Sequence, residues 1–332
     1  MKWQIEELNL PLKFDWALSR GSTKIKTNFL VKVDRDGIIG RGEVAFNVRY
    51  GETKESVLLE FRRFSESLST ELDTLSDLNN FMQDLDLSGS LRCGLEMAFV
   101  DLLSKMSDET IEKLLGLQVI QSVKTSFSVP VLSSEKIEEF YQEFNLARFE
   151  SLKIKLAGDG HDLERIKKVC SLSNQKIRLD ANEGFEYSRN VLQLLDQLPL
   201  ERVEFIEQPM PSAKVEEYKI LRSSSPVPVI LDESLTDTRV TQIIAEQGRG
   251  INVKLMKSGG YLKAMAQIRE ARSMGLKIMI GCMVETSLGI SAAMRLCKGV
   301  DFVDLDGFLF LNKDPFELAF EENGKLIKND LH

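Results

Sequence analysis

Three short apolar runs, SLKIK (151–155), KIRLD (176–180) and VEFIE (203–207), each end in a charged residue. Short runs rich in β-branched and aromatic side chains are typical of buried strands. Stretches with helical spacing of apolar residues lie between the runs of this kind, for example Gly259–Met274. Strands that alternate with helices predict an α/β fold built on a parallel sheet.

The alternation of strand and helix continues from residue 126 to residue 306. Its eight strand candidates are Ser126–Val131, Ser151–Leu156, Lys176–Asp180, Val203–Glu207, Val227–Asp232, Ile251–Leu255, Lys277–Gly281 and Phe302–Asp306. Eight such strands in roughly 180 residues predict a TIM barrel. An open doubly wound sheet is the alternative, but no GxGxxG follows the first strand.

The first 125 residues follow a different order. Strand-like stretches at Thr27–Val33 and Ile38–Ala45 flank Asp34–Gly37, whose Asp-Gly pair is a strong hairpin signal. Helical patterns follow, at about Glu52–Leu68, Ser76–Leu85 and Ser88–Met106. We therefore predict an α+β domain over residues 1–125 and a barrel domain over 126–306. The tail, 307–332, is too short for a domain and is expected to complete the first one.

The bulk composition excludes several classes of protein. The 332 residues are 43% hydrophobic and 28% charged, as in ordinary globular proteins. No apolar run approaches the roughly 20 residues that span a bilayer, and Met1–Lys13 lacks the apolar core of a signal peptide. A net charge of −8 disfavours nucleic acid. We expect a cytoplasmic protein without nucleic-acid or membrane partners, and a homo-oligomer is left open.

Histidine and cysteine usage limits the chemistry. The two histidines, His161 and His332, are too few for an imidazole-rich zinc site and disfavour a Ser-His-Asp triad. Acid–base chemistry must then use Lys, Asp, Glu, Tyr or Cys. The four cysteines show no CxxC spacing, which favours free thiols.

Five charged residues end consecutive predicted strands, 22 to 27 residues apart: Lys155, Asp180, Glu207, Asp232 and Lys254. The carboxyl ends of barrel strands meet at one face, where active sites lie. Three carboxylates gathered there would repel one another unless a cation joined them. Mg²⁺ prefers oxygen ligands and keeps positions open for substrate, so the pattern predicts a Mg²⁺ site. A single carboxylate after a strand usually begins the next helix, which is our interpretation of Asp159 and Asp162.

Lys155 and Lys254 would face each other across the barrel mouth, because they end the second and sixth strands. A nearby divalent cation and Lys153 would disfavour the charged ammonium and lower its pKa towards neutrality. A lysine with such a pKa can act as a base. The alternative is that both lysines only form ion pairs with neighbouring acids.

In this order and spacing the chain resembles the enolase superfamily, and within it the muconate lactonizing enzyme-like subgroup. The segments that carry the resemblance are Arg49–Thr53, Leu152–Lys155, Leu179–Asn182, Ile206–Pro209, Leu231–Ser234, Asn252–Gly260 and Gly281–Ser287. The resemblance implies a capping domain over a modified (β/α)7β barrel. It implies one Mg²⁺ per subunit on the three carboxylates and an acid–base pair of Lys155 and Lys254. It also implies substrate contact by Lys153 and supporting roles for Asn182, Glu233 and Glu285.

Asp304-Leu305-Asp306 at the eighth strand resembles the Asp-x-Asp of the dipeptide epimerases. In that family an aspartate pairs with the free α-ammonium of a dipeptide, so Asp306 would take this role and Asp304 would assist. The resemblance implies inversion of the C-terminal residue of the dipeptide. The implied mechanism is a two-lysine 1,1-proton transfer through an enediolate.

The pocket for the second side chain of the dipeptide is expected from Leu18–Lys24, from the segment around Phe46–Tyr50, which includes Tyr50, and from the barrel ends. A glutamate there would need a cation, for which Arg20, Lys24 and Lys26 are candidates. A small or hydrophobic residue would suit Ile154, Met256, Met283 and Phe308, for which ordinary core packing is the alternative. We favour Ala followed by a small or hydrophobic residue.

Three other functions remain open. One is a related lyase, such as an o-succinylbenzoate synthase or a muconate cycloisomerase, whose substrates lack an ammonium group. Another is an N-acylamino acid racemase, which would share the lysine pair. The last belongs to a different class, a catalytically inactive barrel that acts as a binding protein.

Overall fold

The computed structural model describes residues 1–18 and 21–329. Its N-terminal part is an antiparallel sheet of β1 (Lys2–Leu18), β2 (Gly21–Arg35) and β3 (Ile38–Val44). Four helices follow, α1 (Lys54–Ser67), α2 (Leu75–Gln83), α3 (Gly89–Ser107) and α4 (Ile111–Leu114). The predicted hairpin joins β2 to β3, with Asp36 and Gly37 at the positive φ angles that such turns require.

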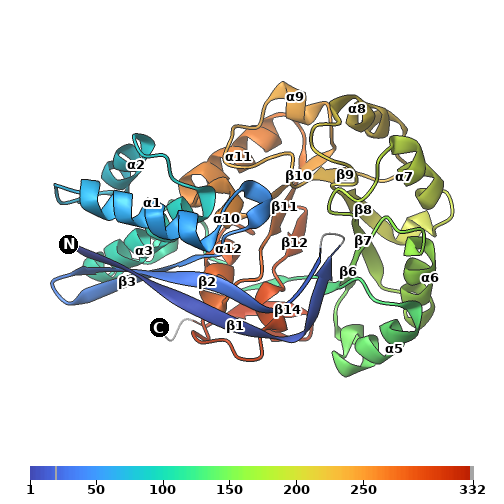
Figure 1. Ribbon diagram of the computed structural model, residues 1–332, viewed down its shortest axis with the longest axis horizontal. Coiled ribbons are helices and arrows are strands. Elements are labelled where there is room, and N and C mark those ends of the chain that lie inside the picture. The colour runs from blue at the N-terminus through green and yellow to red at the C-terminus, as the bar shows by residue number, and fades with distance from the viewer. Residues whose placement is uncertain (19–20, 330–332) are drawn as a thin grey trace.

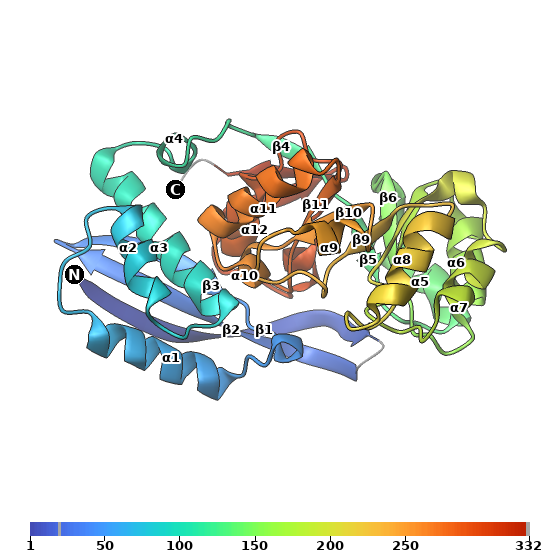
Figure 2. The same cartoon turned by 90° about the horizontal axis from the view of Figure 1, so that it is seen from above.

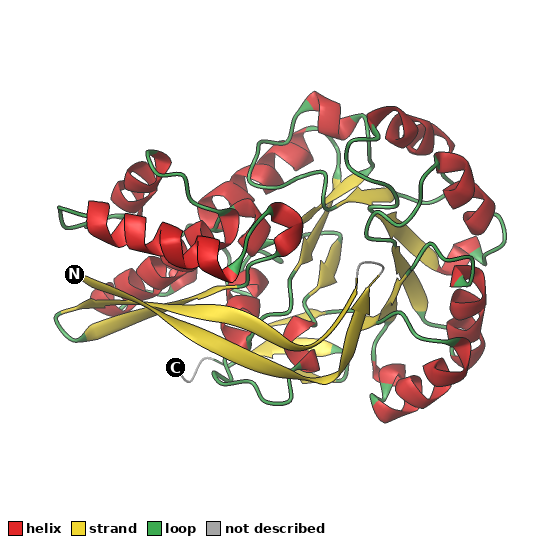
Figure 3. Cartoon of the chain, in the orientation of Figure 1, coloured by secondary structure: helices red, strands yellow, loops and turns green. Residues whose placement is uncertain are grey.

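The second part of the chain is a ring of parallel strands enclosed by helices (Figures 1 and 3). Its strands lie side by side in chain order, from β5 to β12. The strands are β5 (Phe127–Val129), β6 (Ser151–Lys155), β7 (Lys176–Asp180), β8 (Val203–Glu207), β9 (Val229–Leu231), β10 (Gly250–Val253), β11 (Lys277–Gly281) and β12 (Phe302–Asp304). The helices between them are α5 (Ser134–Glu143), α6 (Asp162–Leu172), α7 (Ser188–Leu195), α8 (Val215–Ser224), α9 (Gln242–Ala245), α10 (Leu255–Ser258), α11 (Tyr261–Ser273) and α12 (Ser287–Met294). Between β12 and residue 329, where the described part of the chain ends, there is no α-helix, so the predicted (β/α)7β barrel is confirmed.

The barrel closes between β5 and β12 through side chains. Ser126 Oγ donates to Asp304 Oδ1 at 2.6 Å, and the Ser128 amide donates to Asp306 Oδ2 at 2.5 Å. The Leu305 amide also donates to Thr125 Oγ1 at 2.9 Å. Polar groups that a β-ladder would satisfy are therefore held here by side-chain oxygens.

The two parts of the molecule lie against each other, as the view from above makes clear (Figure 2). The long β1–β2 ribbon extends from the N-terminal part towards the barrel, where Phe14 packs edge-to-face on Phe140 and Phe144. The tail touches this ribbon through a bridge between Leu12 and Leu311. The tail also forms β13 (Ala319–Glu322) and β14 (Lys325–Lys328), and β14 pairs with β4 (Ser122–Lys124). The division at residues 125 and 306 stays a prediction.

All eight predicted barrel strands are present, and three have the predicted bounds. The helices predicted at about Glu52–Leu68, Ser76–Leu85, Ser88–Met106 and Gly259–Met274 correspond to α1, α2, α3 and α11. Among the residues that the structure describes, no helix combines the length and apolar character that crossing a bilayer requires.

Strand β3 packs directly against the backbone of α3, because glycines remove the side chains between them. A Cβ at Gly42 would lie 2.1 Å from the Gly94 carbonyl oxygen, and one at Gly40 would lie 2.1 Å from that of Ala98. Helix α3, on which the strand packs, also contacts α10 and α11 of the barrel.

We expect Gly42→Ala to lower the free energy of unfolding by at least about 1–3 kcal/mol, since the added methyl group overlaps backbone atoms that cannot rotate away. Urea denaturation would measure the change. Arg41→Ala, at the exposed neighbouring position, is the control and should alter stability by less than about 0.5 kcal/mol. A Gly42→Ala protein as stable as the control would contradict the packing described.

Candidate active site

A cavity of about 240 Å³ opens at the carboxyl ends of the barrel strands, beneath residues of the N-terminal part. The predicted residues that line it include Lys153, Lys155, Asp232, Lys254, Asp304 and Asp306. Tyr50, Asn182, Glu233 and Met283 line it as well. The structure thus brings most of the predicted site residues to one cavity.

The charged strand ends lie level with one another. Lys155 on β6 is in register with Asp180 on β7, which is in register with Glu207 on β8. Asp232 and Lys254 follow the last residues of β9 and β10. Four strand steps separate Lys155 from Lys254 in an eight-stranded ring, so the two lysines stand on opposite sides of the mouth.

Lys153 lies at the centre of the charged cluster. Its Nζ is 2.9 Å from Asp180 Oδ2, 2.7 Å from Glu207 Oε2 and 2.8 Å from Asp304 Oδ2. Burial lowers the pKa of Lys153, but these three carboxylates outweigh burial and hold the pKa well above its usual range. Lys155 Nζ adds a second contact to Asp180 Oδ2 at 2.6 Å.

Asp180 and Glu207 differ in how their charges are balanced. Burial raises the pKa of Asp180, but the ammonium groups of Lys153 and Lys155 outweigh it and keep the carboxyl ionised. Burial raises the pKa of Glu207 too, and the charge of Asp180 raises it further. The negative charge of Glu207 is therefore less completely compensated than that of Asp180.

Asp232 holds the opposite side of the cluster. Its Oδ2 accepts from Lys254 Nζ at 2.8 Å, and its Oδ1 accepts from Lys257 Nζ at 2.7 Å. Burial lowers the pKa of Lys254, yet the charge of Asp232 leads the groups that raise it well above its usual range. An acid thus contacts the Lys254 ammonium group directly, and the lower pKa expected beside a divalent cation stays a prediction.

The donor set fits a hard divalent cation. Asp180, Glu207 and Asp232 are fully buried and come from three neighbouring strands. Glu207 Oε2 accepts no hydrogen bond from the described residues and pairs only through charge with Lys153. Within the described part of the chain, no group of three acidic, histidine or cysteine side chains has the arrangement of a metal site. The Lys153 ammonium group lies between Asp180 and Glu207 instead. Carboxylate oxygens are nevertheless the ligands that Mg²⁺ prefers.

Asp304 and Asp306 lie at the seam of the barrel, which is the place where β12 meets β5. Asp304 accepts from Ser126 with one oxygen and from Lys153 with the other. Asp306 accepts from the Ser128 amide, and burial together with the charge of Asp304 raises its pKa to about 7. Asp306 thus faces the cavity as a buried carboxylate that a cation would keep ionised.

The predicted supporting residues contact the cluster at its edge. Asn182 accepts from Lys155 Nζ at 3.2 Å and donates to Glu233 Oε1 at 3.3 Å. Burial, followed by the charge of Asp232, raises the pKa of Glu233 to about 7. Glu285 accepts from the Met283 amide at 2.7 Å, and burial followed by the charge of Glu43 raises its pKa to about 8.

The outer wall of the cavity is mainly aromatic and aliphatic. Trp16 stacks on Phe310 with ring centroids 4.5 Å apart, and both line the cavity with Phe46, Val48 and Val284. Lys26 lines it too, but its Nζ donates to the Phe46 carbonyl at 2.7 Å, and burial lowers its pKa. Lys24 is exposed and 3.4 Å from Asp15, whereas Arg20 lies outside the described residues.

Three of the four predicted apolar pocket residues do not line the cavity. Ile154, Met256 and Phe308 belong to the buried core, so their alternative interpretation as packing residues is confirmed. Met283 does line the cavity. Sequence reasoning did not identify Trp16 or Phe310, because each depends on where a distant segment reaches the barrel mouth. It also missed Ser128 on β5 and Cys282 directly after β11, although their positions at barrel strands could have indicated them.

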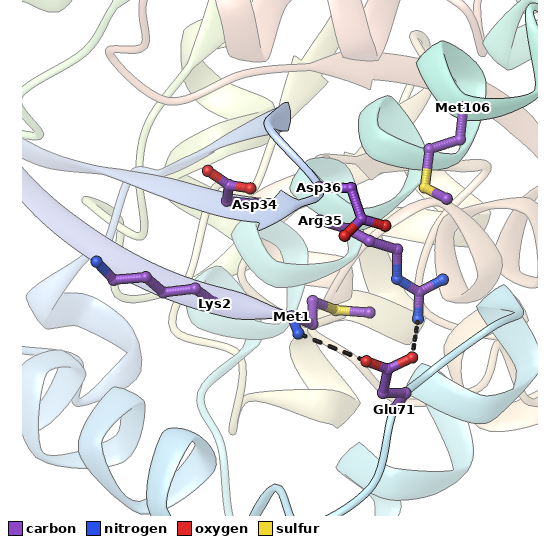
Figure 4. A pocket seen from close by; sticks show the side chains of 7 residues that line it. All are labelled: Met1, Lys2, Asp34, Arg35, Asp36, Glu71 and Met106. Atoms are coloured by element: carbon purple, nitrogen blue, oxygen red, sulfur yellow. Dashed lines mark hydrogen bonds and ion pairs between the residues drawn. The ribbon is translucent and has the colours of Figure 1, made fainter.

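A second hollow of about 430 Å³ lies in the N-terminal part (Figure 4) and is lined by Met1, Lys2, Asp34, Arg35, Asp36, Glu71 and Met106. Two of its cationic groups face one acid: the Met1 amino group is 3.9 Å and the Arg35 guanidinium 3.5 Å from the Glu71 carboxylate. No barrel residue lines this hollow, and it does not combine a base with a metal-binding set as the first cavity does.

Comparison with known proteins agrees with this geometry. The family model described as "Enolase C-terminal domain-like" matches residues 134–317. An L-Ala-D/L-Glu epimerase of Bacteroides thetaiotaomicron is 30% identical over 100% of this chain and 86% of its own length. A hydrophobic dipeptide epimerase of a Flavobacteria bacterium is 30% identical over 100% of this chain and 96% of its own.

One solved structure extends the comparison to the fold. The dipeptide epimerase of Methylococcus capsulatus, complexed with Mg and the dipeptide L-Arg-D-Lys, superposes with a TM-score of 0.87. It is 25% identical, with 99% of this chain and 96% of that one covered. A family match over more than half of the chain and relatives that span all of it lead to one conclusion: the protein belongs to the enolase superfamily.

Proposed function

We propose that this protein is a Mg²⁺-dependent dipeptide epimerase, an isomerase that inverts the α-carbon of the C-terminal residue of Ala-Xaa dipeptides. One observation carries the proposal. A single cavity holds two lysines on opposite sides and, at its seam, two buried carboxylates that can receive an ammonium group. The names of the relatives support it.

Asp180, Glu207 and Asp232 would hold the metal ion. When bound, Mg²⁺ supplies Lewis acidity that stabilises negative charge developing on the substrate carboxylate. The carboxylates that it engages would also exert less attraction on Lys155 and Lys254, each of which now contacts one of them. A lysine freed in this way loses its proton more readily and can serve as a base.

Lys155 and Lys254 would carry the proton on the two faces of the substrate. The α-proton beside a carboxylate is weakly acidic, so its removal needs a base held within hydrogen-bonding reach. One lysine takes the proton from its face, leaving an enediolate, and the opposite lysine gives a proton to the other face. Inversion follows because the returning proton comes from the other side of the cavity.

Asp306, assisted by Asp304, would bind the free α-ammonium of the dipeptide. The seam places both carboxylates in the wall of the same cavity as the lysines. A free ammonium group would compensate the buried charge of Asp306, whereas an acylated amine could not. This argument favours a dipeptide over the substrates of an N-acylamino acid racemase or of the related lyases.

We infer that Xaa is a small or hydrophobic residue. Trp16, Phe310, Val48 and Met283 give the outer wall an apolar character. Lys26 is the described cation that lines the cavity from the N-terminal part, but burial lowers its pKa and its Nζ already donates to the Phe46 carbonyl. If the dipeptide that reacts fastest has an acidic Xaa, the inferred preference for a small or hydrophobic residue is wrong. A cytoplasmic location and the oligomeric state stay predictions.

A dipeptide screen tests the proposal as a whole. Incubation of L-Ala-Xaa dipeptides with the protein and Mg²⁺ in D₂O should introduce one deuterium at the α-carbon of Xaa, fastest for small or hydrophobic Xaa. Mass spectrometry would follow the uptake, and treatment with EDTA should abolish it. No uptake by any free-amino dipeptide from folded protein would refute the epimerase function and leave the related lyase, the N-acylamino acid racemase and the binding protein as alternatives.

Single lysine variants test the two-base mechanism. Lys155→Ala and Lys254→Ala should each slow epimerisation by at least about 10²-fold, because general acid–base catalysis contributes rate factors of that size. Each variant should still exchange the α-proton of one epimer through the remaining lysine. Lys277→Ala, at the exposed amino end of β11, is the control and should epimerise normally. Normal epimerisation by either active-site variant would exclude the pair as sole bases.

Asp306→Asn tests recognition of the ammonium group. We expect KM for the best dipeptide to rise about 10- to 100-fold, the value of a hydrogen bond to a charged group. The pH dependence has a defined sign: since burial and Asp304 raise the pKa of Asp306 to about 7, protonation below that pH should raise the KM of the unmodified enzyme. Asp306→Asn should remove this dependence between pH 6 and 8, while Asp301→Asn at the amino end of the strand should keep it. An unchanged KM would favour a lyase or an acyl-substrate racemase.

A further inference from the structure

Glu96 is a buried carboxylate of the N-terminal part that lies at the start of a barrel helix. It sits in the middle of α3 and is 1% exposed. Its Oε1 accepts from the Leu262 amide at 3.1 Å, and the Tyr261 amide also donates to the carboxylate. Tyr261 and Leu262 begin α11, so Glu96 satisfies amides that the helix itself leaves unpaired.

Both residues before α11 favour glycine, Gly260 because a side chain has no room there and Gly259 because of its positive φ angle. Gly260 has φ +111°, and a Cβ there would lie 2.5 Å from Glu96 Oε1. Gly259 has φ +88°, and its amide and that of Gly260 both donate to the Leu255 carbonyl, at 3.0 and 3.1 Å. The Glu96 carboxylate therefore determines where the Gly259–Gly260 junction can lie.

This junction ends the short helix that begins at Lys254. Lys254 is the residue before α10, and its carbonyl accepts from the Ser258 amide at 2.8 Å. The five residues from Lys254 to Ser258 thus form one turn whose far end is fixed by the junction. Any displacement of Gly259–Gly260 must move this turn, because one continuous set of backbone hydrogen bonds joins them.

Helix α3 contacts the same turn at two further points on the same face. A Cβ at Gly89 would lie 2.9 Å from the Lys257 carbonyl oxygen, so the two backbones are in contact. Arg92 lies beside the position of a Cβ at Gly259, with its Cδ 3.7 Å away. Residues 89, 92 and 96 have the spacing of one helical face. Glu96 is the residue of this face that accepts hydrogen bonds from barrel amides.

We infer that Glu96 is a positioning residue for Lys254: through the start of α11 and the Gly259–Gly260 junction it sets the place of the lysine that acts on one face of the substrate. This inference rests on the proposed proton transfer. Lys155 has a separate support, since Asp162 accepts from the amides of Ala157 and Gly158 just after β6. A change at Glu96 should therefore affect one face of the substrate and not the other.

The experiment measures the two faces separately. In a Lys155→Ala background, exchange of a dipeptide α-proton with D₂O reports Lys254 alone, and in a Lys254→Ala background it reports Lys155 alone. The probe is the L-Ala-Xaa dipeptide that exchanges fastest with the unmodified enzyme, tested as both epimers. Adding Glu96→Gln should slow the Lys254-dependent exchange at least about tenfold, since small misplacements of a catalytic group cost rate factors of that order.

The Lys155-dependent exchange should stay within about twofold, as for independent sites. The ratio of the two rates corrects for any loss of folded protein. Gly260→Ala, which disturbs the junction from the other side, should give the same one-sided effect. Glu217→Gln is the matched control, because Glu217 accepts from the Ser188 amide at 2.7 Å and so supports α7, a helix on the Lys155 side of the ring. It should leave the ratio unchanged.

Equal loss on both faces, or no loss on either, would overturn the inference. A second measurement decides it even if no dipeptide proves to be a substrate. Amide hydrogen exchange of peptides that cover residues 255–262 should be about tenfold faster in Glu96→Gln, because a lost cap promotes local opening. Peptides that cover residues 151–160 should be unaffected. Unchanged protection of residues 255–262 would also overturn the positioning role, whatever the reaction.

Discussion

The constraint on which the site depends is the repulsion among carboxylates that the barrel forces together. Asp180 and Glu207 are directly in register on neighbouring parallel strands, and Asp232 follows on the next strand. All three are buried, so water cannot screen their charges. Four ammonium groups offset this repulsion, each within hydrogen-bonding distance of at least one of the carboxylates: those of Lys153, Lys155, Lys254 and Lys257. The residues of the proposed chemistry are therefore the residues that make the barrel mouth electrostatically tolerable.

At the seam, too, residues of the proposed site have a structural role. A barrel that does not complete its ladder between β5 and β12 must satisfy backbone groups there by other means. Asp304 and Asp306 accept from Ser126 and from the Ser128 amide, and they thereby place two carboxyl groups in the cavity wall. The proposed recognition of an ammonium group uses carboxylates that already have a structural task. Their substitution would thus affect both the closure of the ring and the binding of substrate.

How much the sequence predicted depends on how local each feature is. Strands β7, β8 and β11 were predicted with their observed bounds, because buried parallel strands form short continuous apolar runs between clear helices. Lys155, Asp180, Glu207, Asp232 and Lys254 were found for the same reason: their positions at strand ends fix their place in space. By contrast, Trp16 enters the cavity because β1 changes register between Pro11 and Trp16 and bends towards Phe310. Neither the bend nor the partner can be deduced from a local pattern. The 2.8 Å contact between Lys254 and Asp232 likewise depends on side-chain placement that no local pattern in the sequence reveals.

A second carboxylate of the N-terminal part, like Glu96, accepts hydrogen bonds from the first amides of a barrel helix. Glu43, on β3, accepts from the Thr286 amide at 3.0 Å and from the Gly289 amide at 3.1 Å, at the start of α12. Two successive barrel helices therefore begin on carboxylates supplied by the other part of the chain. Pulling the N-terminal part away as one body would uncap both, at a cost of about 1 kcal/mol or more for each cap, and would leave two carboxylates without their amide partners. A further contact between the two parts is the two-bond ion pair of Arg49 with Glu183, at 2.7 and 2.6 Å, in which the Glu183 side chain is 10% exposed. Together these contacts oppose separation of the two parts, so the place of the N-terminal part over the cavity and the starts of two barrel helices are fixed by the same residues.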